Sequence, residues 1–298
     1  MTIVTGVDAG GTKTVAAVAD GTGELGRAVG PAGAVRPGRA MTAASTIATT
    51  VRRSLAAVGL LRTDVLVVGA SGVGREEERL ALRDALRIEG FTDRLVVTTD
   101  IEIALEAAFG QSPGIVLLAG TGSFGAARLA DGRIVRQGGY GWQMGDDGSA
   151  YAIGRAALVT VGRGHDGRGP ATSLEAGLIG LTRSGDFAGL VRWSVAAGPA
   201  EVASLAAAAL AAADGGDQMA EAILEEASAG LAAHAAALLP GFEGDGPVSV
   251  ALAGGLLEQD RYRRSVARAL AETPRLALRP GPLDPVTGAL AIAARHRT

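Results

Sequence analysis

Two short glycine turns carry residue types that can bind phosphate. The first, at residues 8–14, reads DAGGTKT and joins two strand-like runs. Its successive backbone N–H groups at Gly10 and Gly11, the Thr12 hydroxyl and the chain's only lysine, Lys13, are donors suited to phosphate oxygens. Asp8 is suited to hold a hydrated magnesium ion beside them. The alternative is a plain β-hairpin whose glycines supply positive φ, and the turn alone leaves both interpretations open.

The second turn, at residues 119–125, reads AGTGSFG. Gly120, Gly122 and Gly125 match the G-x-G-x-x-G dinucleotide fingerprint, but that fingerprint must open a helix and here another strand follows. A second phosphate hairpin, built around Thr121 and Gly122, is therefore the better interpretation. Two such hairpins, one opening each half of the chain, predict a polyphosphate held from both sides.

Asp100 ends a strand-like run and directly precedes a helical one. A carboxylate at this point is suited to take the proton from an attacking hydroxyl, which is the role of a general base. An acid before a helix is equally often an N-cap, so the residue alone favours neither role.

Two further glycine-rich segments have the character of ligand sites. Residues 138–154 read GGYGWQMGDDGSAYAIG, and Asp146 there is suited to accept hydrogen bonds from sugar hydroxyls. The alternative is that Asp146, Asp147 or Ser149 caps the helix that follows. Residues 251–259, ALAGGLLEQ, form a strand–glycine–helix turn that could support a flat base, although a tight turn explains them equally well.

The composition narrows the classes of protein. The chain has 298 residues, 48% of them apolar and 20% charged, with a net charge of −3 and no cysteine. A large core is expected, disulfides and cysteine-held zinc or iron–sulfur clusters are excluded, and nucleic acid or an anionic membrane surface is disfavoured as a partner. The N-terminus lacks the pattern of a secretory signal, and alanine-rich stretches such as LAAHAAALL are expected to be too short to span a bilayer. We therefore expect a cytoplasmic protein.

The elements that must position these residues follow from the pattern of apolar residues. The first half predicts strands at 3–8, 14–19 and 24–30, followed by alternating helices and strands at 40–59, 65–71, 75–89, 94–100 and 101–109. This order predicts a mixed sheet covered by helices. Because ligands bind beyond the carboxyl ends of strands in such sheets, Asp8, Ser71 and Asp100 are expected at one edge.

The second half repeats the theme. A strand at 114–120 opens a hairpin pair, a helix spans 149–163, and a helical section covers about 171–239. A strand at 247–255 then precedes a helix at 258–271, a short strand at 275–278 and a final helix at 284–295. The predicted boundary falls at residues 110–113. We expect an N-terminal lobe at 1–111, joined by the C-terminal helix at 284–298, and a C-terminal lobe at 112–283.

Together and in this order, the five segments resemble the BadF/BadG/BcrA/BcrD ATPase family, whose members include N-acetylglucosamine kinases, within the sugar-kinase, actin and Hsp70 superfamily. The most specific match is GYGWQMGDDGSAYA, which is similar to the family's G-W-G-x-x-x-G-D-E-G-S-A-Y-W. The resemblance implies two ribonuclease H-like, actin-like ATPase lobes of mixed five-stranded sheets that close on substrate, an ATP-dependent amino-sugar kinase that uses magnesium, and a homodimer.

The resemblance also implies roles for individual residues. Asp8 and Thr12 would serve the ATP phosphates and, through water, the magnesium ion, and Asp100 would be the general base on the sugar 6-hydroxyl. The other matched positions are Thr121 and Gly122 at the junction of phosphate and sugar, Gly139, Tyr140, Gly141 and Asp146 at the sugar, and Gly254 and Gly255 at the adenine.

Two departures from the family pattern leave the identity of the sugar substrate undecided. Arg36 stands before Pro37 where the family usually has asparagine, and Tyr140 replaces the usual tryptophan. N-acetylglucosamine, glucosamine or another sugar therefore fits. A nucleotide- or sugar-binding regulator without turnover is the main alternative, and an actin-like polymer is a weaker one. An activator that carries a cysteine-held iron–sulfur cluster is excluded.

Overall fold

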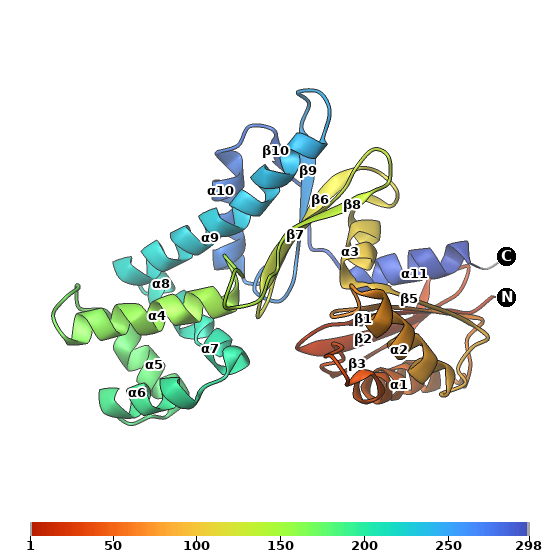
Figure 1. Ribbon diagram of the computed structural model, residues 1–298, viewed down its shortest axis with the longest axis horizontal. Coiled ribbons are helices and arrows are strands. Elements are labelled where there is room, and N and C mark those ends of the chain that lie inside the picture. The colour runs from red at the N-terminus through yellow and green to blue at the C-terminus, as the bar shows by residue number, and fades with distance from the viewer. Residues whose placement is uncertain (1, 297–298) are drawn as a thin grey trace. The chain divides into compact units, whose positions relative to one another are not determined.

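The computed structural model describes residues 2–296 and shows two compact units (Figure 1). Unit 1 consists of the chain up to Ser112 together with the chain from Leu283 onward, and unit 2 is the continuous stretch Pro113–Pro282. Unit 2 is thus an insertion within the sequence of unit 1.

Unit 1 is built on a five-stranded mixed sheet in the order β3-β2-β1-β4-β5. The first three strands form an antiparallel meander, and β4 and β5 run parallel to β1. The strands are β1 (Val4–Ala9), β2 (Lys13–Ala19), β3 (Glu24–Pro31), β4 (Val65–Ala70) and β5 (Arg94–Thr99).

Helices cover both faces of this sheet. Alternate residues of the buried strand β4 point to the two faces of the sheet. On one face, Leu66 and Val68 pack with α1 (Ala40–Ala56) and α2 (Glu76–Arg87). Val65 and Val67 pack with α3 (Asp100–Phe109) and α11 (Pro285–Arg295) on the other face. A strand buried on both faces needs apolar residues at every position, which explains the continuous run VLVV.

Helix α11 crosses α3 at a glycine. A methyl group built on Gly288 would lie closer to the backbone carbonyl oxygen of Ile103 than van der Waals contact allows. The segment after residue 282 therefore completes the core of unit 1, because Ala289 and Ala293 of α11 are fully buried in it.

Unit 2 repeats the sheet topology with the order β10-β9-β6-β7-β8, in which β6, β7 and β8 are antiparallel neighbours and β9 and β10 run parallel to β6. The strands are β6 (Gly114–Ala119), β7 (Ser123–Arg128), β8 (Ile134–Gly138), β9 (Val248–Ala253) and β10 (Leu276–Leu278). The predicted fold class, two mixed five-stranded sheets flanked by helices, is confirmed.

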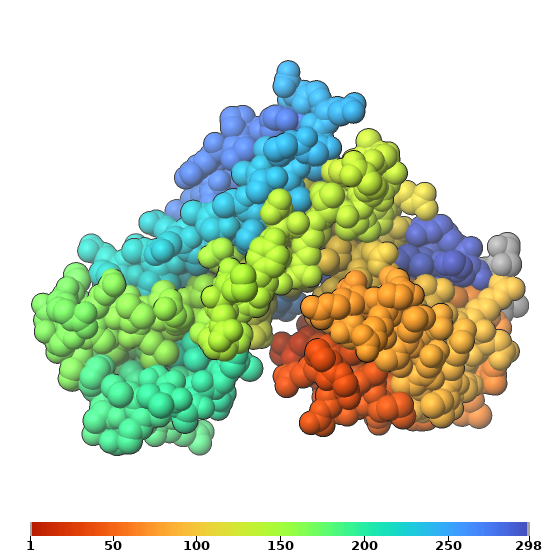
Figure 2. Space-filling view, in the orientation of Figure 1, coloured from red at the N-terminus to blue at the C-terminus, as the bar shows by residue number. Residues whose placement is uncertain are grey.

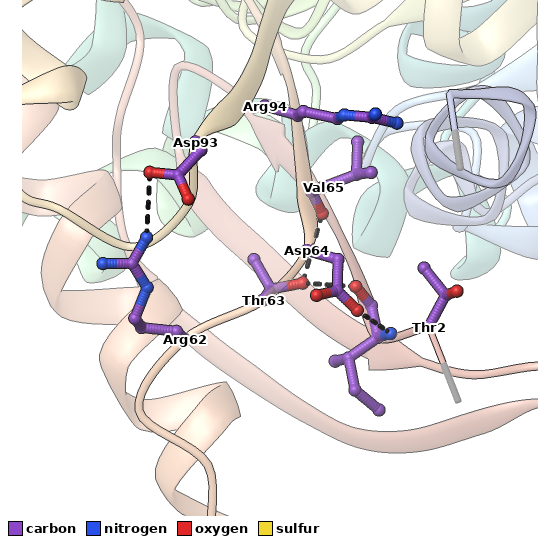
Figure 3. A pocket seen from close by; sticks show the side chains of 8 residues that line it. Thr2, Arg62, Thr63, Asp64, Val65, Asp93 and Arg94 are labelled. Carbon is purple, nitrogen blue, oxygen red and sulfur yellow. Dashed lines mark hydrogen bonds and ion pairs between the residues drawn. The ribbon is translucent and has the colours of Figure 1, made fainter. Parts of the chain in front are cut away.

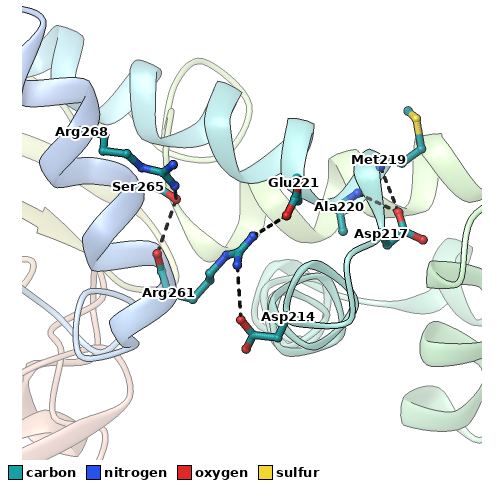
Figure 4. A network of polar contacts seen from close by, with 8 residues as sticks. All are labelled: Asp214, Asp217, Met219, Ala220, Glu221, Arg261, Ser265 and Arg268. Carbon is teal, nitrogen blue, oxygen red and sulfur yellow. Dashed lines mark hydrogen bonds and ion pairs between the residues drawn. The ribbon is translucent and has the colours of Figure 1, made fainter.

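The rest of unit 2 is helical. Its elements are α4 (Ala150–His165), α5 (Leu174–Thr182), α6 (Phe187–Ala196), α7 (Pro199–Ser204), α8 (Ala206–Asp214), α9 (Gln218–Leu238), the 3₁₀ turn η1 (Leu239–Gly241) and α10 (Asp260–Ala271). Arg261 of α10 joins two of the others, with one guanidinium nitrogen 2.8 Å from Glu221 and another 3.7 Å from Asp214 (Figure 4). Asp217 caps α9 by accepting from the N–H groups of Met219 and Ala220 at 3.0 Å each.

The stretch Gln218–Gly241 is long and apolar enough to cross a membrane by length and composition, so the expectation that this alanine-rich stretch is too short is wrong on length. Within its apolar window of 18 residues, 44% is buried in unit 2. There it supplies Leu224, Leu231 and Leu238 to the same core cluster as Ile115 and Leu117 of β6. The helix is therefore a core helix of this unit.

Candidate functional site

In unit 1 the expected polar residues lie at one edge of the sheet. Ala9 of β1 pairs with Ala70 of β4, which pairs with Thr99 of β5, so Asp8, Ser71 and Asp100 share the carboxyl edge as predicted. The Ser71 N–H donates to the Ala9 carbonyl at 3.0 Å and so extends the β1–β4 pairing by one residue.

The pKa of the Asp8 carboxyl, at this edge of the sheet, is strongly shifted. Burial raises its pKa to about 7, and the negative charges of Asp100 and Asp284 add to that effect, while the positive charge of Lys13 opposes it. The same carboxyl is thus under the influence of two further acids and one cation. A carboxyl whose pKa is shifted this far by burial and neighbouring charges is a candidate functional group.

Asp284 is the member of this group that the sequence did not single out. It caps α11 by accepting from the Val286 N–H at 3.3 Å, and its carboxylate lies 2.7 Å from the Arg27 guanidinium. In the sequence, Asp284 could have been noticed only as an aspartate directly before a proline at the start of a helix. This pattern usually indicates only an N-cap.

The cap interpretation of Asp100 is wrong. The N-cap of α3 is Thr99, whose hydroxyl accepts from the Glu102 N–H at 3.2 Å while the Glu102 carboxylate accepts from the Thr99 N–H at 2.9 Å. Asp100 occupies the first helical position, and one of its carboxylate oxygens accepts from the Ile101 N–H at 3.0 Å. Thr99 is therefore the N-cap, and Asp100 is an acid in the first turn, where the positive end of the helix stabilises a carboxylate.

In the first glycine hairpin, some backbone groups form hydrogen bonds within unit 1 and others are exposed without an acceptor among residues 2–296. The Gly10 N–H closes the turn by donating to the Lys13 carbonyl at 3.0 Å, and the Gly10 carbonyl accepts from the loop after β3. Gly11, Thr12 and Lys13 are exposed at the tip. Among residues 2–296, no group accepts a hydrogen bond from the Gly11 or Thr12 N–H. The donors left for a ligand are therefore at Gly11 and Thr12, and Gly10 shapes the turn.

The second hairpin, in unit 2, is anchored to the start of α4. The Gly120 N–H closes it by donating to the Gly122 carbonyl at 2.9 Å. The first amides of α4, those of Ala150 and Tyr151, donate to the carbonyls of Gly120 and Thr121 at 2.9 and 3.2 Å. Thr121 is exposed at the tip, so the hairpin presents its hydroxyl on a turn fixed by a helix.

Asp146 faces this hairpin. Its backbone has φ of 64°, a left-handed conformation that costs free energy for a residue other than glycine, and its side chain is buried. The carboxylate accepts from the Ser123 N–H at 3.3 Å, and a methyl group built on Gly122 would lie 3.0 Å from its oxygens. Burial raises the pKa of Asp146, and the charge of Asp147 acts in the same direction.

Ser149, rather than Asp146 or Asp147, caps α4, since its hydroxyl accepts from the Ala152 N–H at 3.0 Å. One of the three suggested caps is thus correct. The other two acids have no capping role, and the strained backbone holds the Asp146 carboxylate at the hairpin.

The remaining residues of the sugar motif lie on an exposed loop. Gly139 and Gly141 have positive φ of 70° and 88°, and Tyr140 between them is 68% exposed. The Arg136 guanidinium donates to the Gly139 carbonyl at 2.9 Å and lies over the Phe124 ring at 4.6 Å, which ties this loop to β7.

The two glycines after β9 differ in their surroundings. Gly254 has φ of 101°, and a methyl group there would collide with the backbone carbonyl of Ala119 at the end of β6. Gly255 is exposed, and a methyl group on it would meet nothing within 4 Å. The tight turn explains the glycine at position 254. It does not explain the one at 255, where a side chain would extend into open space.

Unit 1 also has a polar cavity at the opposite, amino edge of its sheet (Figure 3). Its polar groups are already used: Asp64 accepts from the Ile3 N–H at 2.7 Å, Thr63 donates to the Ile3 carbonyl at 2.9 Å, and Arg62 lies 3.1 Å from Asp93. The two bonds to Ile3 tie the start of β1 to the loop before β4, and the Arg62–Asp93 pair joins that loop to the loop before β5. Their role is structural.

No group of three or more histidine, aspartate or glutamate side chains within residues 2–296 could hold a metal ion directly. A magnesium ion at Asp8 would therefore keep most of its ligands from water and phosphate, as this cation commonly does.

A solved structure resembles this chain over nearly its whole length, and two curated proteins resemble it over part of its length. A solved structure from Chromobacterium violaceum, assigned as an N-acetylglucosamine kinase, superposes with a TM-score of 0.84 at 30% identity over 98% of this chain and 99% of its own. A curated N-acetylmuramic acid/N-acetylglucosamine kinase from Clostridium acetobutylicum is 32% identical over 165 residues, 55% of this chain and 54% of the relative. An N-acetyl-D-glucosamine kinase from Dictyostelium discoideum is 30% identical over 64% of each chain.

The matched segments thus span about half and about two thirds of these two curated relatives. The family model matches residues 5–293, from the first strand of unit 1 to its last helix. This protein belongs to the BadF/BadG/BcrA/BcrD ATPase family.

Proposed function

We propose that this protein is an ATP-dependent kinase that phosphorylates the 6-hydroxyl of N-acetylglucosamine or a related amino sugar. The observation that carries the proposal is the pair of acids at one sheet edge, Asp8 and Asp100, within electrostatic reach of each other. Phosphoryl transfer needs one carboxylate for the magnesium–phosphate group and another for the acceptor hydroxyl. The names of the relatives support a sugar as the acceptor.

Unit 1 would supply the reacting groups. Asp100 accepts the proton of the sugar 6-hydroxyl as O6 attacks the γ-phosphorus, and the bond from that phosphorus to the bridging oxygen breaks to release ADP. Asp8 would hold a magnesium ion through water, which would supply positive charge beside the phosphates. The N–H groups of Gly11 and Thr12 donate to phosphate oxygens, and Lys13 adds positive charge nearby.

Unit 2 would supply substrate contacts. Thr121 and Gly122 lie at the second hairpin, whose fixed turn would present donors where phosphate and sugar meet. Asp146 accepts from sugar hydroxyls, and the exposed loop at 139–141 contributes the flat face of Tyr140. Gly254 and Gly255 form the surface for the adenine, with Gly255 providing the open space.

Arg36 bears on the choice of sugar. It is exposed in the loop after β3, and the following turn is closed by the Arg39 N–H, which donates to the Arg36 carbonyl at 2.9 Å. Its charge would favour a sugar with a polar or anionic substituent over an unsubstituted hexose. A homodimer and a cytoplasmic location are further expectations of the same proposal.

The test is ADP release measured with glucosamine, N-acetylglucosamine, glucose and N-acetylmuramate, each with and without the Asp100→Asn change. Sugar-stimulated ADP release that the change removes supports the kinase. Saturable binding of ATP and sugar with no turnover would instead identify a regulator. Nuclear magnetic resonance of the product identifies the phosphorylated hydroxyl, and phosphate on a position other than O6 would overturn that part of the proposal.

A further inference from the structure

Unit 2 contains a cavity of about 860 Å³ that none of the proposed substrate contacts uses. It is an open cavity lined by the loop at 142–148, by α4 and by α9, all within unit 2. In the space-filling view the yellow-green atoms of the segment leading into α4 are exposed beside the green atoms of α4 itself (Figure 2). This volume lies within the usual range of small-molecule sites.

The loop that carries Asp146 has two faces with different partners. The Asp146 carboxylate bonds to the second hairpin at Ser123, whereas the neighbouring residues Gly145, Asp147 and Gly148 line the cavity. Helix α9 approaches this second face at Gly230, where an added methyl group would lie 3.1 Å from the Asp147 Cβ. The cavity is therefore separate from the hairpin side of the loop.

The lining combines aromatic and polar side chains. Trp142 and Tyr151 lie with ring centroids 5.6 Å apart at 55°, and Trp142 is 46% exposed, so one aromatic face borders the cavity. Gln143, Arg155 and Glu226 supply donors and acceptors. Within the described part of the chain, no hydrogen bond or ion pair engages these three side chains.

This combination matches the chemistry of a pyranose ring. The apolar C–H face of the ring packs on an aromatic side chain, and its adjacent hydroxyls are both donors and acceptors, suited to carboxylates, amides and guanidinium. Among the lining residues one cation, Arg155, stands against two carboxylates, Asp147 and Glu226. A phosphorylated ligand would face a net negative lining, which disfavours ATP and a sugar phosphate.

We propose that this cavity is a second saccharide site that binds an uncharged pyranose, distinct from the site of phosphoryl transfer. Its occupant contacts the reverse side of the loop that carries Asp146. Sugar bound there holds that loop in place, which would make the affinity of the Asp146 side depend on sugar concentration. The inference goes beyond the kinase reaction and needs no turnover.

The experiment uses the full chain with Trp193→Phe, which leaves Trp142 as the only tryptophan. Without nucleotide, N-acetylglucosamine and glucose are titrated and followed by Trp142 fluorescence and by calorimetry. We expect two sugars per chain. Adding Asp146→Asn should remove one of them and leave a saturable Trp142 response.

Glu226→Gln and Arg155→Ala should each weaken the remaining response about ten-fold, the loss expected for a hydrogen bond to a charged group. Glu225→Gln is the matched control, because Glu225 is an exposed neighbour on α9 that does not line the cavity. Glucosamine 6-phosphate should produce no Trp142 response in the Asp146→Asn background.

A stoichiometry of one that Asp146→Asn abolishes, loss of the Trp142 response with Asp146→Asn, or equal effects of Glu226→Gln and Glu225→Gln would each overturn the second site. Because binding is measured without nucleotide, a chain that binds two sugars but releases no ADP would refute the kinase proposal alone. A chain that releases ADP but binds only one sugar, at a site that Asp146→Asn abolishes, would refute the second site alone.

Discussion

Asp8, near the end of β1, and Asp100, directly after β5, lie at the carboxyl ends of two strands separated by β4, and the charge of Asp100 helps to raise the pKa of Asp8 to about 7. Burial is the larger cause. With its pKa raised to about 7, Asp8 stays partly protonated near neutral pH in the absence of a cation. A bound magnesium ion would favour its ionised form.

This raised pKa predicts an unusual pH dependence of stability. In the unfolded chain Asp8 ionises near pH 3.8, but in the folded chain only near 7, so folding becomes less favourable as the pH rises between these values. Asp8→Asn removes that penalty. Its gain in free energy of unfolding over the parent should grow by about 2 kcal/mol from pH 5 to pH 8 in urea titrations without magnesium. Asp245→Asn, at an exposed position, is the control, and a gain that stays constant with pH would contradict the assignment.

Replacing the proposed base should slow the chemical step more than binding. Asp100→Asn keeps the size of the side chain but cannot accept the hydroxyl proton, so kcat should fall by about 10²–10⁴-fold. The dissociation constant of ATP, measured by calorimetry, should change little. Because Thr99 supplies the cap of α3, the melting temperature should also be nearly unchanged. An undiminished kcat would remove Asp100 from the role of base.

The adjacent glycines after β9 should respond differently to the same substitution. Gly254→Ala places a methyl group against the Ala119 carbonyl at φ of 101°, and we expect a loss of about 2 kcal/mol or more in free energy of unfolding. Gly255→Ala meets open space and should cost within about 0.5 kcal/mol. If the adenine lies on this surface, Gly255→Ala would weaken ATP binding without loss of stability. Equal stability losses would show that the two positions are equally confined.

The crossing of α11 and α3 gives a second matched pair. Gly288→Ala forces the two backbones apart at Ile103 and should cost about 3 kcal/mol in free energy of unfolding. Gly162→Ala, in helix α4 with no atom within 4 Å of the added methyl group, should be neutral or stabilising by about 0.5 kcal/mol. Urea unfolding followed by circular dichroism measures both. A neutral Gly288→Ala would show that the helices separate easily.

Much of the fold could be read from local patterns. The run VLVV predicts a strand buried on both faces, and β4 is such a strand. The alternation of strands and helices in the first half predicts a mixed sheet with helices on its faces, as found. The helix expected at 40–59 ends instead at Ala56, and the one expected from 258 starts at Asp260, because turns at both ends contain residues that also fit a helical pattern.

The site was harder to anticipate, because its electrostatics depend on residues distant in sequence. Asp100 was identified by its place after a strand, but only the structure shows that Thr99 takes over the cap. Asp284 is separated from Asp8 by most of the chain, and no local pattern connects them. Likewise, the sequence cannot show that the N–H and carbonyl of Gly10 form hydrogen bonds within unit 1. Nor can it show that the N–H groups of Gly11 and Thr12 form none among residues 2–296.

The insertion of unit 2 within unit 1 has a consequence for synthesis on the ribosome. The segment Pro113–Pro282 is continuous and can acquire its core as soon as it leaves the exit tunnel. The N-terminal part of unit 1 is synthesised first, but its core can be completed only after α11 has been synthesised, because Ala289 and Ala293 of α11 lie in one layer of that core. One apolar face of the nascent N-terminal sheet therefore has α3 but lacks α11 while all of unit 2 is translated, which makes that interval the point at which a chaperone would be needed.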